Sequence, residues 1–528
     1  MKTKMAKVLA AAVALAGLVA GTARADAAAV RVSGYFSDHM VLQRGEGTSV
    51  WGKAAPGAKV KVAFAGQSLE ATADAKGDWK ATFAKLAVSK EGRDLVISSA
   101  APAIEQSNNP NNQTIFHDVL VGDVWIASGQ SNAEMTFGML GNVVNQREEI
   151  ARAKDYPNVR AIKVERRSSA WPIDFALKTS GWRAADAKSL PRITAMGYFF
   201  ARDVNAKTGI PIGIVDDNWS GQYIQEFLSP AAAEASPLGK DMKAWRTKVA
   251  EWHEAYAAYM RGERETLGDD FWPSIEDPLE SRIHNGMIRP LRHLNPAGVL
   301  WYQGCANEGD GLGYETLLDT LIADWRGMWG KDLPFYVVQL ASYTAPTTDP
   351  KGGNGFAPVR EAQRRTVAKT PRTGLAVAID IGHATNIHPA NKQDVGSRLA
   401  RWALRDVYGE KDLVPSGPWY RAVEFKGNAA RLSFDHVGGG LCAAEKDPDG
   451  AGVAPKVKDT KSLKGFAVRA KDGSWHWAEA TIDGDGVVVT AKDVAEPVAV
   501  RYAYRANPMG AADLYNAEGL PAVPFTTE

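Results

Sequence analysis

The sequence predicts an α/β protein whose central, mainly parallel sheet is doubly wound and carries a β-module at each end. Five apolar runs, separated by long stretches with helix-like patterns, indicate five buried parallel strands. Short alternating apolar and polar runs before and after this region indicate the two β-modules. The five apolar runs cover residues 119–127, 210–215, 298–302, 335–340 and 375–381.

The first 25 residues have the pattern of a cleavable export signal. Three lysines precede an apolar run over residues 8–20, and residues 22–25 supply small side chains for a cleavage site. The apolar run is too short to span a bilayer. We therefore expect an exported chain, periplasmic or secreted, with no membrane insertion of its mature part.

Charge and cysteine content exclude several classes of function. The formal net charge is +1, and removing a signal with four basic residues leaves −3, so nothing favours nucleic acid or membrane binding. The two cysteines, Cys305 and Cys442, cannot form a disulfide framework, and we expect no structural disulfide. The histidines are scattered without metal-ligand spacing, so we predict no catalytic metal.

Changes in periodicity divide the chain into parts. An alternating pattern with turns at 55–57 and 76–78 predicts a small β-sandwich, and a polar Asn/Pro stretch follows it as a linker. The segment 237–267 looks helical and is predicted to belong to an insertion in the α/β domain. The predicted parts are a signal peptide (1–25), an N-terminal β-sandwich module (26–106), an α/β domain (115–412, with an insertion at about 228–282) and a C-terminal β-rich module (415–528).

The first apolar run ends in a turn that suits a nucleophile. The run stops at Gly129-Gln130-Ser131-Asn132, and a helix is predicted to follow. A serine at such a corner exposes its hydroxyl at the carboxyl end of a strand, while the backbone N–H groups of the helix start face any nearby oxyanion. On this segment alone, an ordinary turn serine that caps a helix is an equally good interpretation.

Three other strand ends supply groups for the same chemistry, because reactive groups in an open α/β sheet gather beyond the carboxyl ends of its strands. After the second run, Gly221 could bring its N–H close to a substrate without interference from a Cβ. After the third, Asn307 offers an amide that could donate to an oxyanion. The fifth run leads to His383 and His388, which are candidate bases.

Together these blocks resemble the SGNH hydrolases and, within them, the sialate O-acetylesterase branch. That branch typically reads G-Q-S-N-M, N-x-W-G-G-T, W-Y-Q-G-E-S-N and D-I-H-P-x-N-K, in this order. The chain carries Gly129–Asn132, Asn218–Gly221, Trp301–Gly304 with Asn307, and Asn386–Lys392 running to Arg398–Ala400. Further similar text lies at Phe36–Gln43, His284–Ile288, Tyr515–Asn516 and Gly519–Pro521, so the resemblance covers nearly the whole mature chain.

The resemblance implies an SGNH-type fold and an ester hydrolase that removes acetyl groups from sugar hydroxyls, with an acetylated sugar or glycan as its partner and no cofactor. Ser131 would attack the acetyl carbonyl, and His388 would take its proton and later return it to the sugar hydroxyl. The oxyanion hole would comprise the N–H of Ser131, the N–H of Gly221 and the side-chain amide of Asn307. Substrate contacts are expected from Gln130, Trp219, Gln222 and Gln303, with Trp219 stacking on a sugar face.

The chain departs from the family pattern in three blocks. Cys305 and Ala306 replace the usual Glu-Ser, and Gln222 replaces a threonine. Asn386 replaces the aspartate of the last block, and Thr385 stands where SGNH hydrolases carry their triad acid. Asp380, at the end of the same strand, is the first candidate for that acid; a backbone carbonyl or Asn386 could orient His388 instead.

Several alternatives remain open on sequence alone. His383 competes with His388 as the base, and Cys305 competes with Ser131 as the nucleophile. For function, the first hypothesis is an esterase of acetylated sialic acids, and the second is the same chemistry on a plant polysaccharide such as acetylated xylan. The third is a non-catalytic carbohydrate-binding protein with a degenerate triad.

Overall fold

The computed structural model describes residues 29–99, 104–105, 112–138, 143–175, 177–237 and 281–528, together with isolated positions between 247 and 263. The predicted export signal and most of the predicted insertion, including its helix-like segment, lie outside these residues. Within the described part of the chain, no helix has the length and apolar character needed to cross a membrane.

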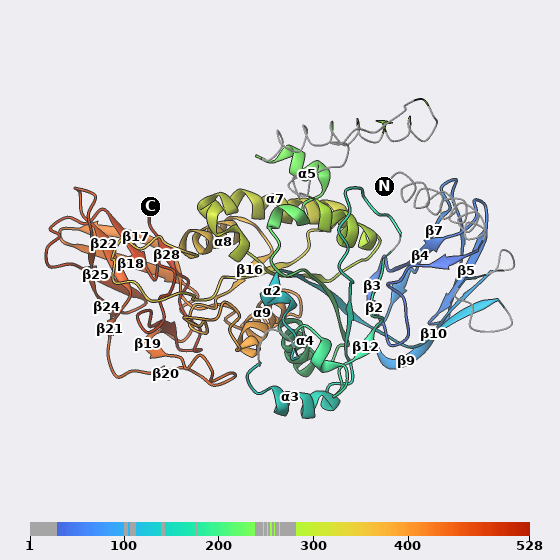
Figure 1. The fold of residues 1–528 in the computed structure, drawn as a ribbon. Helices are drawn as coiled ribbons and strands as arrows, with labels where there is room; N and C mark the ends of the chain where they lie inside the picture. Colours follow the sequence, from blue (N-terminus) through green and yellow to red (C-terminus); the bar gives the residue numbers. More distant parts are fainter. Residues whose placement is uncertain are drawn as a thin grey trace, which may run out of the picture.

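A large mixed sheet forms the centre of the molecule (Figure 1). Its parallel strands follow the order β11, β13, β10, β14, β15, β16, and the antiparallel strand β12 lies at one edge. The predicted α/β class is thereby confirmed, although the sheet has one parallel strand more than expected. The additional strand is β11, which the apolar pattern missed because Arg160 and Lys163 interrupt it. The bounds are β10 (Gln113–Gly129), β11 (Val159–Lys163), β12 (Arg183–Ala184), β13 (Ile212–Asn218), β14 (Gly298–Tyr302), β15 (Phe335–Val338) and β16 (Thr373–Ala376).

Helices cover both faces of this sheet. Helices α7 and α8 lie on one face, and α4 and α9 lie on the other (Figure 1). Every residue of β13 and β14 is buried. This burial explains why β14 and the first part of β13, as far as Val215, read as continuous apolar runs. The helix bounds are α2 (Ser131–Glu134), α3 (Gln146–Arg152), α4 (Ala195–Thr208), α5 (Pro230–Ala235), α7 (Tyr314–Trp329), α8 (Ala357–Lys369) and α9 (Lys392–Asp406).

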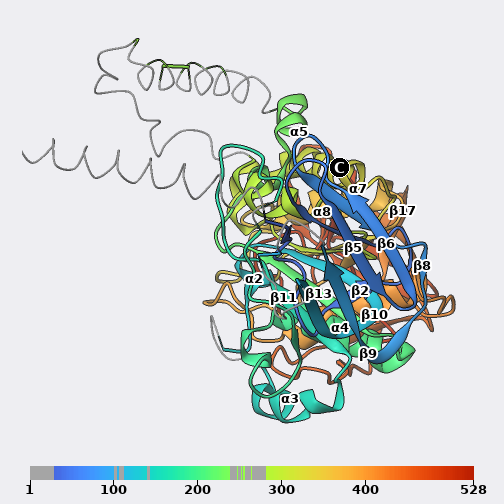
Figure 2. The ribbon, with the colours of Figure 1, turned by 90° about the vertical axis from the view of Figure 1, so that its right-hand side faces the viewer.

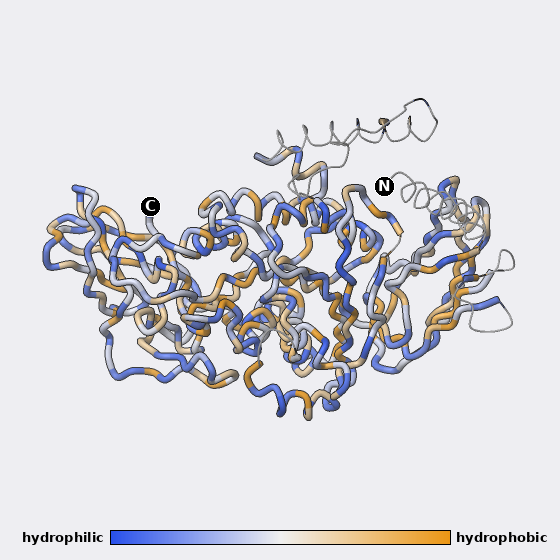
Figure 3. The backbone as a smooth tube through the Cα atoms, viewed as in Figure 1, coloured by the Kyte–Doolittle hydropathy of each residue, from blue (hydrophilic) through white to orange (hydrophobic). Residues whose placement is uncertain are grey.

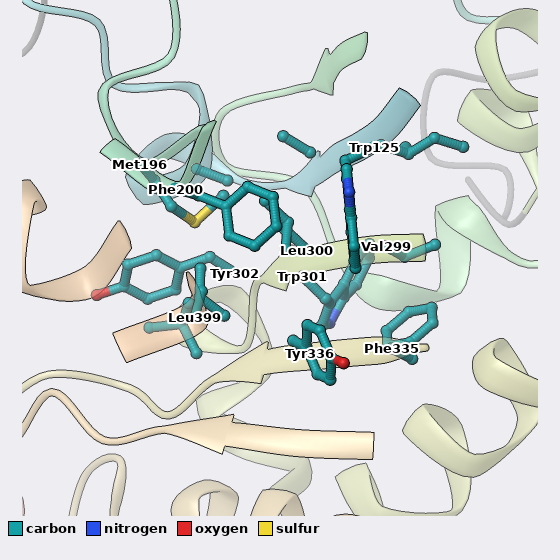
Figure 4. Close-up of a cluster of buried hydrophobic side chains, with 14 of the residues drawn as sticks. Trp125, Met196, Phe200, Val299, Leu300, Trp301, Tyr302, Phe335, Tyr336 and Leu399 are labelled. Atoms are coloured by element: carbon teal, nitrogen blue, oxygen red, sulfur yellow. The ribbon is translucent and has the colours of Figure 1, made fainter. Parts of the chain in front are cut away.

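Aromatic side chains fill the space between the sheet and its helices (Figure 4). On one face, Trp125 meets Phe200 of α4 edge-on, with ring centroids 4.9 Å apart. On the other face, Trp301 packs against Trp325 of α7 at 5.8 Å in the same T-shaped geometry, which aromatic pairs prefer. This packing fixes the strands whose carboxyl ends carry the predicted site.

Strand β10 joins the N-terminal β-strands to the central sheet. Its first half pairs with β9 and β2, and its second half pairs with β13 and β14 (Figure 2). The residues 113 and 114, predicted to lie in a linker, are therefore the start of a strand. The N-terminal bounds are β1 (Arg31–Val32), β2 (Val41–Gln43), β3 (Gly45–Glu46), β4 (Ser49–Lys53), β5 (Lys59–Phe64), β6 (Gln67–Thr72), β7 (Asp78–Thr82), β8 (Lys85–Leu86) and β9 (Ser89–Ser98).

The C-terminal strands form separate antiparallel sheets, and hydrophobic and hydrophilic residues alternate along them (Figure 3). Arg360 of α8 connects this part to the sheet: it is fully buried and donates to the carbonyl oxygens of Leu340, Ala341, Arg505 and Ala506 at 2.6–2.8 Å. The bounds are β17 (Trp419–Lys426), β18 (Ala429–Asp435), β19 (Leu441–Glu445), β20 (Lys456–Val457), β21 (Ser462–Leu463), β22 (Phe466–Arg469), β23 (Trp475–Trp477), β24 (Glu479–Asp483), β25 (Gly486–Thr490), β26 (Ala499–Tyr502), β27 (Leu514–Asn516) and β28 (Phe525–Thr526).

Candidate active site

Strand β10 is the point at which the strand order of the sheet reverses. The chain first adds β11 and β13 on one side of β10 and then β14, β15 and β16 on the other. In an open α/β sheet, the crevice beyond the carboxyl end at such a point is where ligands bind. Gly129, the last residue of β10, is in register with Asn218 of β13 and Tyr302 of β14, so three of the predicted blocks begin at the same level.

Backbone hydrogen bonds hold these three blocks together. The N–H of Trp219 donates to the carbonyl of Gly129 at 3.0 Å, and the N–H of Gln130 donates to the carbonyl of Tyr302 at 3.1 Å. A Cβ on Gly129 would lie 2.2 Å from the Tyr302 carbonyl oxygen, and the φ of Gly129 is +138°. Glycine is therefore required at the end of β10 for this close approach.

Ser131 is the first residue of α2 and is partly exposed. The helix itself offers no acceptor for the N–H of its first residue, so this N–H is available to an oxyanion. The preceding Gln130 is buried, and its Oε1 accepts from the N–H of Gly304 at 2.9 Å and that of Ala306 at 3.4 Å. The Gln130 oxygen thus fixes the turn against the loop after β14.

His388 lies in the loop between β16 and α9, and hydrogen bonds attach this loop to the serine turn. Asn132 Nδ2 donates to the carbonyl of Ile387 at 2.9 Å. The residue after Ser131 is therefore hydrogen-bonded to the residue before His388. Burial and then the nearby Lys392 lower the pKa of His388. The imidazole is therefore neutral at physiological pH, which is the form that accepts a proton.

The other polar residues of this loop shape its backbone. His383 Nδ1 accepts from the N–H groups of Thr385 and Asn386, each at 3.1 Å. Asn386 Oδ1 accepts from the backbone N–H of His388 at 2.9 Å. Asn386 therefore contacts the backbone of His388 and not its ring. Nδ1 of His383 is already occupied as a hydrogen-bond acceptor, which disfavours His383 as the catalytic base.

Asp380 does not pair with His388 in this conformation. Its Oδ1 and Oδ2 accept from Nη1 and Nη2 of Arg398, both at 2.7 Å, and the hydroxyl of Tyr515 donates to Oδ2 at 3.3 Å. No hydrogen bond joins Asp380 to His388, both of which the structure describes. The expected arrangement fails because β16 ends at Ala376, and the chain beyond it turns toward Arg398 and the C-terminal sheets.

The side-chain amide of Asn307 is also occupied. Its Oδ1 accepts from the N–H of Ile224 at 3.1 Å and from Gln303 Nε2 at 2.6 Å, which fixes the orientation of the amide. Its Nδ2 then donates to Gln225 Oε1 at 2.8 Å and to Asp310 Oδ2 at 2.6 Å. Both amide hydrogens have partners, so Asn307 must exchange one of them before it can donate to an oxyanion.

The loop after β13 presents Gly221 at the surface with a φ of +77°. Just before it, the N–H and Oγ of Ser220 donate to Glu134 Oε2 at 2.9 and 2.7 Å. On the other side, Gln222 Nε2 donates to the Ser220 carbonyl at 3.3 Å, and Gln303 Nε2 donates to the Gln222 carbonyl at 3.1 Å. These contacts hold the backbone that carries the Gly221 N–H.

Glu134, which the sequence did not single out, organises this side of the site. Its buried carboxylate accepts from Arg166 Nε at 3.1 Å and Nη2 at 2.6 Å and from Lys163 Nζ at 3.1 Å, in addition to Ser220. Burial raises its pKa, but these donors outweigh burial and hold the pKa below its usual value. The sequence signal was a carboxylate one helical turn after Ser131.

A cleft of about 930 Å³ opens beside Glu134. Arg166 lines it and also lies over the Trp219 ring at 5.9 Å. Arg183 and Arg192 line it as well, and neither forms an ion pair with a carboxylate among the described residues. Asp216 contributes a buried carboxyl whose pKa is raised by burial to about 6. The cleft therefore offers cations and hydrogen-bonding groups beside the serine turn.

Cys305 is a free thiol, as is Cys442. Burial raises the pKa of Cys305 to about 12. Since the thiolate is the reactive form of cysteine, this environment disfavours Cys305 as a nucleophile. Among the described residues, no group of three or more histidine, cysteine, aspartate or glutamate side chains could hold a metal ion.

We expect Glu134→Gln to lower kcat for a small aryl acetate by roughly 10-fold to 100-fold, because a displaced Gly221 N–H would weaken an oxyanion contact. Steady-state kinetics check the change. Glu149 provides a matched control: it is a buried carboxylate of α3 with Arg202 2.9 Å away. A Glu149→Gln variant that lost kcat equally would mean that only general destabilisation was being measured.

Comparison with known proteins identifies the class and the family of the chain. Residues 275–405 match the family model described as carbohydrate esterase, sialic acid-specific acetylesterase. The chain is 27% identical to the sialate O-acetylesterase of Mus musculus over 97% of this chain and 96% of the mouse protein. It is also 27% identical to that of Homo sapiens, over 77% of this chain and 76% of the human protein.

A solved structure is similar over almost the full length. A carbohydrate acetylesterase from Xanthomonas citri is 33% identical, with a TM-score of 0.76 and coverage of 94% of this chain and 99% of that one. The protein is thus an esterase, and its function is that of a carbohydrate O-acetylesterase. The chain belongs to the sialate O-acetylesterase family, as the four sequence blocks predicted.

Proposed function

We propose that this carbohydrate O-acetylesterase works through a serine acetyl-enzyme. Ser131 Oγ attacks the acetyl carbonyl carbon while His388 accepts the hydroxyl proton, and the resulting imidazolium returns that proton to the departing sugar oxygen. Water then attacks the acetyl-enzyme with His388 again as base, which releases acetate and restores the serine. Every proton is thereby accounted for without a metal or a cofactor.

The observation that carries this proposal is the bonding of the two segments that bear Ser131 and His388. Asn132 links the serine turn to Ile387 at 2.9 Å, at the sheet position where the strand order reverses. The lowered pKa of His388 supports its role as a base. These facts favour Ser131 over Cys305, which is partly buried and whose pKa is raised, and they favour His388 over His383, whose Nδ1 already accepts two hydrogen bonds.

We assign the oxyanion contacts to the N–H groups of Ser131 and Gly221, with the amide of Asn307 joining once it exchanges a partner. Asp380 is not carried into the mechanism, because Arg398 and Tyr515 occupy its oxygens. His388 is then oriented by its loop alone, as a Ser-His dyad. Gln130, Trp219, Gln222 and Gln303 remain the proposed substrate contacts around this dyad.

For the substrate, we propose an acetylated sialic acid, with acetylated xylan or another plant polysaccharide as the alternative. The curated mouse and human relatives are named sialate O-acetylesterases. The cleft beside Glu134 carries Arg183 and Arg192, and guanidinium groups suit a sugar carboxylate. A neutral acetylxylan would gain nothing from these charges.

We also propose an SGNH-type fold for the central domain, the domain boundaries given above, and export of the chain. An SGNH-type domain over residues 115–412 is supported by the position of Ser131 after β10 and of His388 just before α9. The divisions 26–106 and 415–528, the signal peptide over residues 1–25 and export to the periplasm or the medium rest on the sequence patterns.

Acetate release from O-acetylated sialic acid, acetylxylan and a small aryl acetate tests the function and the substrate together. We expect the highest kcat/KM on the sialic acid, and we expect Arg192→Gln to raise KM for that substrate without changing turnover of the aryl acetate. A preference for acetylxylan that Arg192→Gln leaves unchanged would select the alternative. No release from any substrate by folded protein would favour the non-catalytic binding role.

A further inference from the structure

Lys392, the first residue of α9, is a fully buried lysine beside the proposed dyad. Its Nζ donates to Asn132 Oδ1 at 2.7 Å and to the carbonyl of Pro389 at 2.8 Å. It also lies 5.6 Å from the centre of the Tyr302 ring. All of these partners are neutral, so the ammonium has no counter-ion in its hydrogen bonds.

Such an environment is unfavourable for a lysine. Burial of an ammonium without a carboxylate is expensive, and the group responds by losing its proton more readily. Burial accordingly lowers the pKa of Lys392 to about 7, and this effect outweighs the opposing influence of the nearby Cys305. A neutral donor would satisfy the same two oxygens, those of Asn132 and Pro389. Hydrogen bonding alone therefore does not explain why a cationic side chain occupies this position.

We propose that Lys392 is a positioning residue that fixes the histidine loop against the serine turn and keeps His388 in its neutral, proton-accepting form. This inference rests on the proposed function, because it assigns to Lys392 an effect on the Ser131–His388 dyad. The sequence blocks include Lys392 as the last residue of the match Asn386–Lys392, but they assign it no role.

The geometric part of the inference is a closed set of three hydrogen bonds. Asn132, next to Ser131, donates to Ile387 and accepts from Lys392, while Lys392 also binds Pro389. Ile387 and Pro389 flank His388 on both sides. Serine and base must approach to about 3 Å for proton transfer, and a displacement of about 1 Å can lower a rate by roughly 10²-fold.

The electrostatic part follows from the sign of the charge. Two influences lower the pKa of His388: its partial burial and the positive charge of Lys392. Lys392 in turn faces the thiol of Cys305, which burial keeps protonated and neutral. While His388 titrates below its ordinary value, Lys392 carries its proton, so it opposes the imidazolium and extends the neutral form of His388 to lower pH.

The two parts do not depend on the same protonation state. Above pH 7 the Lys392 amine becomes neutral, but it retains two hydrogens for its two acceptors. The hydrogen bonds to Asn132 and Pro389 therefore persist at alkaline pH, and only the effect on His388 is lost. The position of the loop and the acid limit of activity are consequently separable in an experiment.

The test compares Lys392→Met, Lys392→Arg and Lys446→Met by the pH dependence of kcat/KM on a small aryl acetate, with a melting temperature for each variant. Lys446 is a matched control, since it is also buried against α9 and pairs with Asp394 at 2.8 Å. We expect Lys392→Met to lower kcat by roughly 10-fold to 100-fold and to move the acid limb of the profile to higher pH. Lys392→Arg keeps the charge and so keeps the wild-type limb.

Two results would overturn the inference. One is a folded Lys392→Met protein with the kcat and acid limb of the wild type. The other is an equal shift of the limb in Lys446→Met, which would make it a general effect of destabilisation. If Lys392→Met fails to fold, Lys392→Arg still tests the electrostatic part. Because arginine keeps the positive charge, a shifted acid limb of the kcat/KM profile in Lys392→Arg would overturn the proposed effect of that charge on His388. Failure of the proposed function shows separately, as activity that survives in Ser131→Ala.

Discussion

Ser131→Ala will lower kcat/KM for every acetyl ester by roughly 10³-fold or more, because the alanine has no oxygen to form the acetyl-enzyme. His388→Ala will cause a loss of similar size, since the serine hydroxyl is a weak nucleophile without a base. Groups that act in one step are not additive, so the double variant will be hardly worse than either single one. Initial rates of acetate release at substrate concentrations well below KM measure kcat/KM for all three variants.

Ser128→Ala is the control for this prediction. Ser128 lies on β10, three residues before Ser131, and is fully buried with its hydroxyl donating to the Asp217 carbonyl at 2.7 Å. It should retain catalysis and lose only some stability. A double variant whose loss equals the product of the two single losses would mean that Ser131 and His388 act in different steps.

Asp217→Asn will stabilise the protein at neutral pH. Asp217 lies near the end of β13, fully buried, and neither carboxyl oxygen has a hydrogen-bond partner. Burial, followed by the nearby Asp216, raises its pKa to about 8. At pH 7 the folded protein must keep this carboxyl protonated, whereas the unfolded chain is free to ionise it.

The pH dependence follows from that difference. Below the unfolded pKa of 3.8 both states are protonated, and the group has no effect on stability. As pH rises toward the folded value of about 8, the unfolded state is increasingly favoured, by a few kcal/mol at pH 7 on the scale of about 1.4 kcal/mol per pKa unit. Asparagine cannot ionise, so this destabilisation disappears.

Chemical denaturation at pH 4 and pH 7 measures the effect. The gain in the free energy of unfolding for Asp217→Asn should be present at pH 7 and nearly absent at pH 4. Asp123→Asn serves as a contrast, because Asp123 is equally buried but accepts from Gln43 and Arg44, each at 2.8 Å. That variant should be destabilised. A loss of stability at pH 7 for Asp217→Asn would show that its carboxylate is ionised and paired.

The fold was predictable where burial is complete. Strand β14 has the predicted bounds, because all five of its residues are buried and read as one apolar run. Strand β11 was missed since Arg160 and Lys163 lie within it, and their charges are neutralised by Asp118 and Glu134 from distant segments. Such pairings depend on tertiary contacts that no local pattern reveals.

The site was predictable to the level of the backbone. Turn chemistry and family-like blocks indicated which strand ends converge, and the register of Gly129 with Asn218 and Tyr302 brings those ends together. Side-chain partners were less accessible. Asp380 follows β16 closely in sequence, yet its direction is set by Arg398 of α9, and the Asn307 amide is set by Asp310 and Gln225.

Two residues beside the site, Glu134 and Lys392, had a signal that could have been read. Glu134 is three positions after Ser131 within α2, a spacing that places both side chains on the same side of a helix. Lys392 is the last residue of the block Asn386–Lys392, which resembles the family pattern. Whether either charge is buried or solvated cannot be decided without the neighbouring strands.

The central claim is that Ser131 is the nucleophile, and covalent labelling with a fluorophosphonate tests it most directly. The reagent modifies an activated serine irrespective of the natural sugar, so the result does not depend on the choice of substrate. Peptide mapping should place one adduct on Ser131, with labelling abolished in Ser131→Ala and retained in Ser128→Ala. An adduct on another residue, or labelling that persists in Ser131→Ala, would contradict the account.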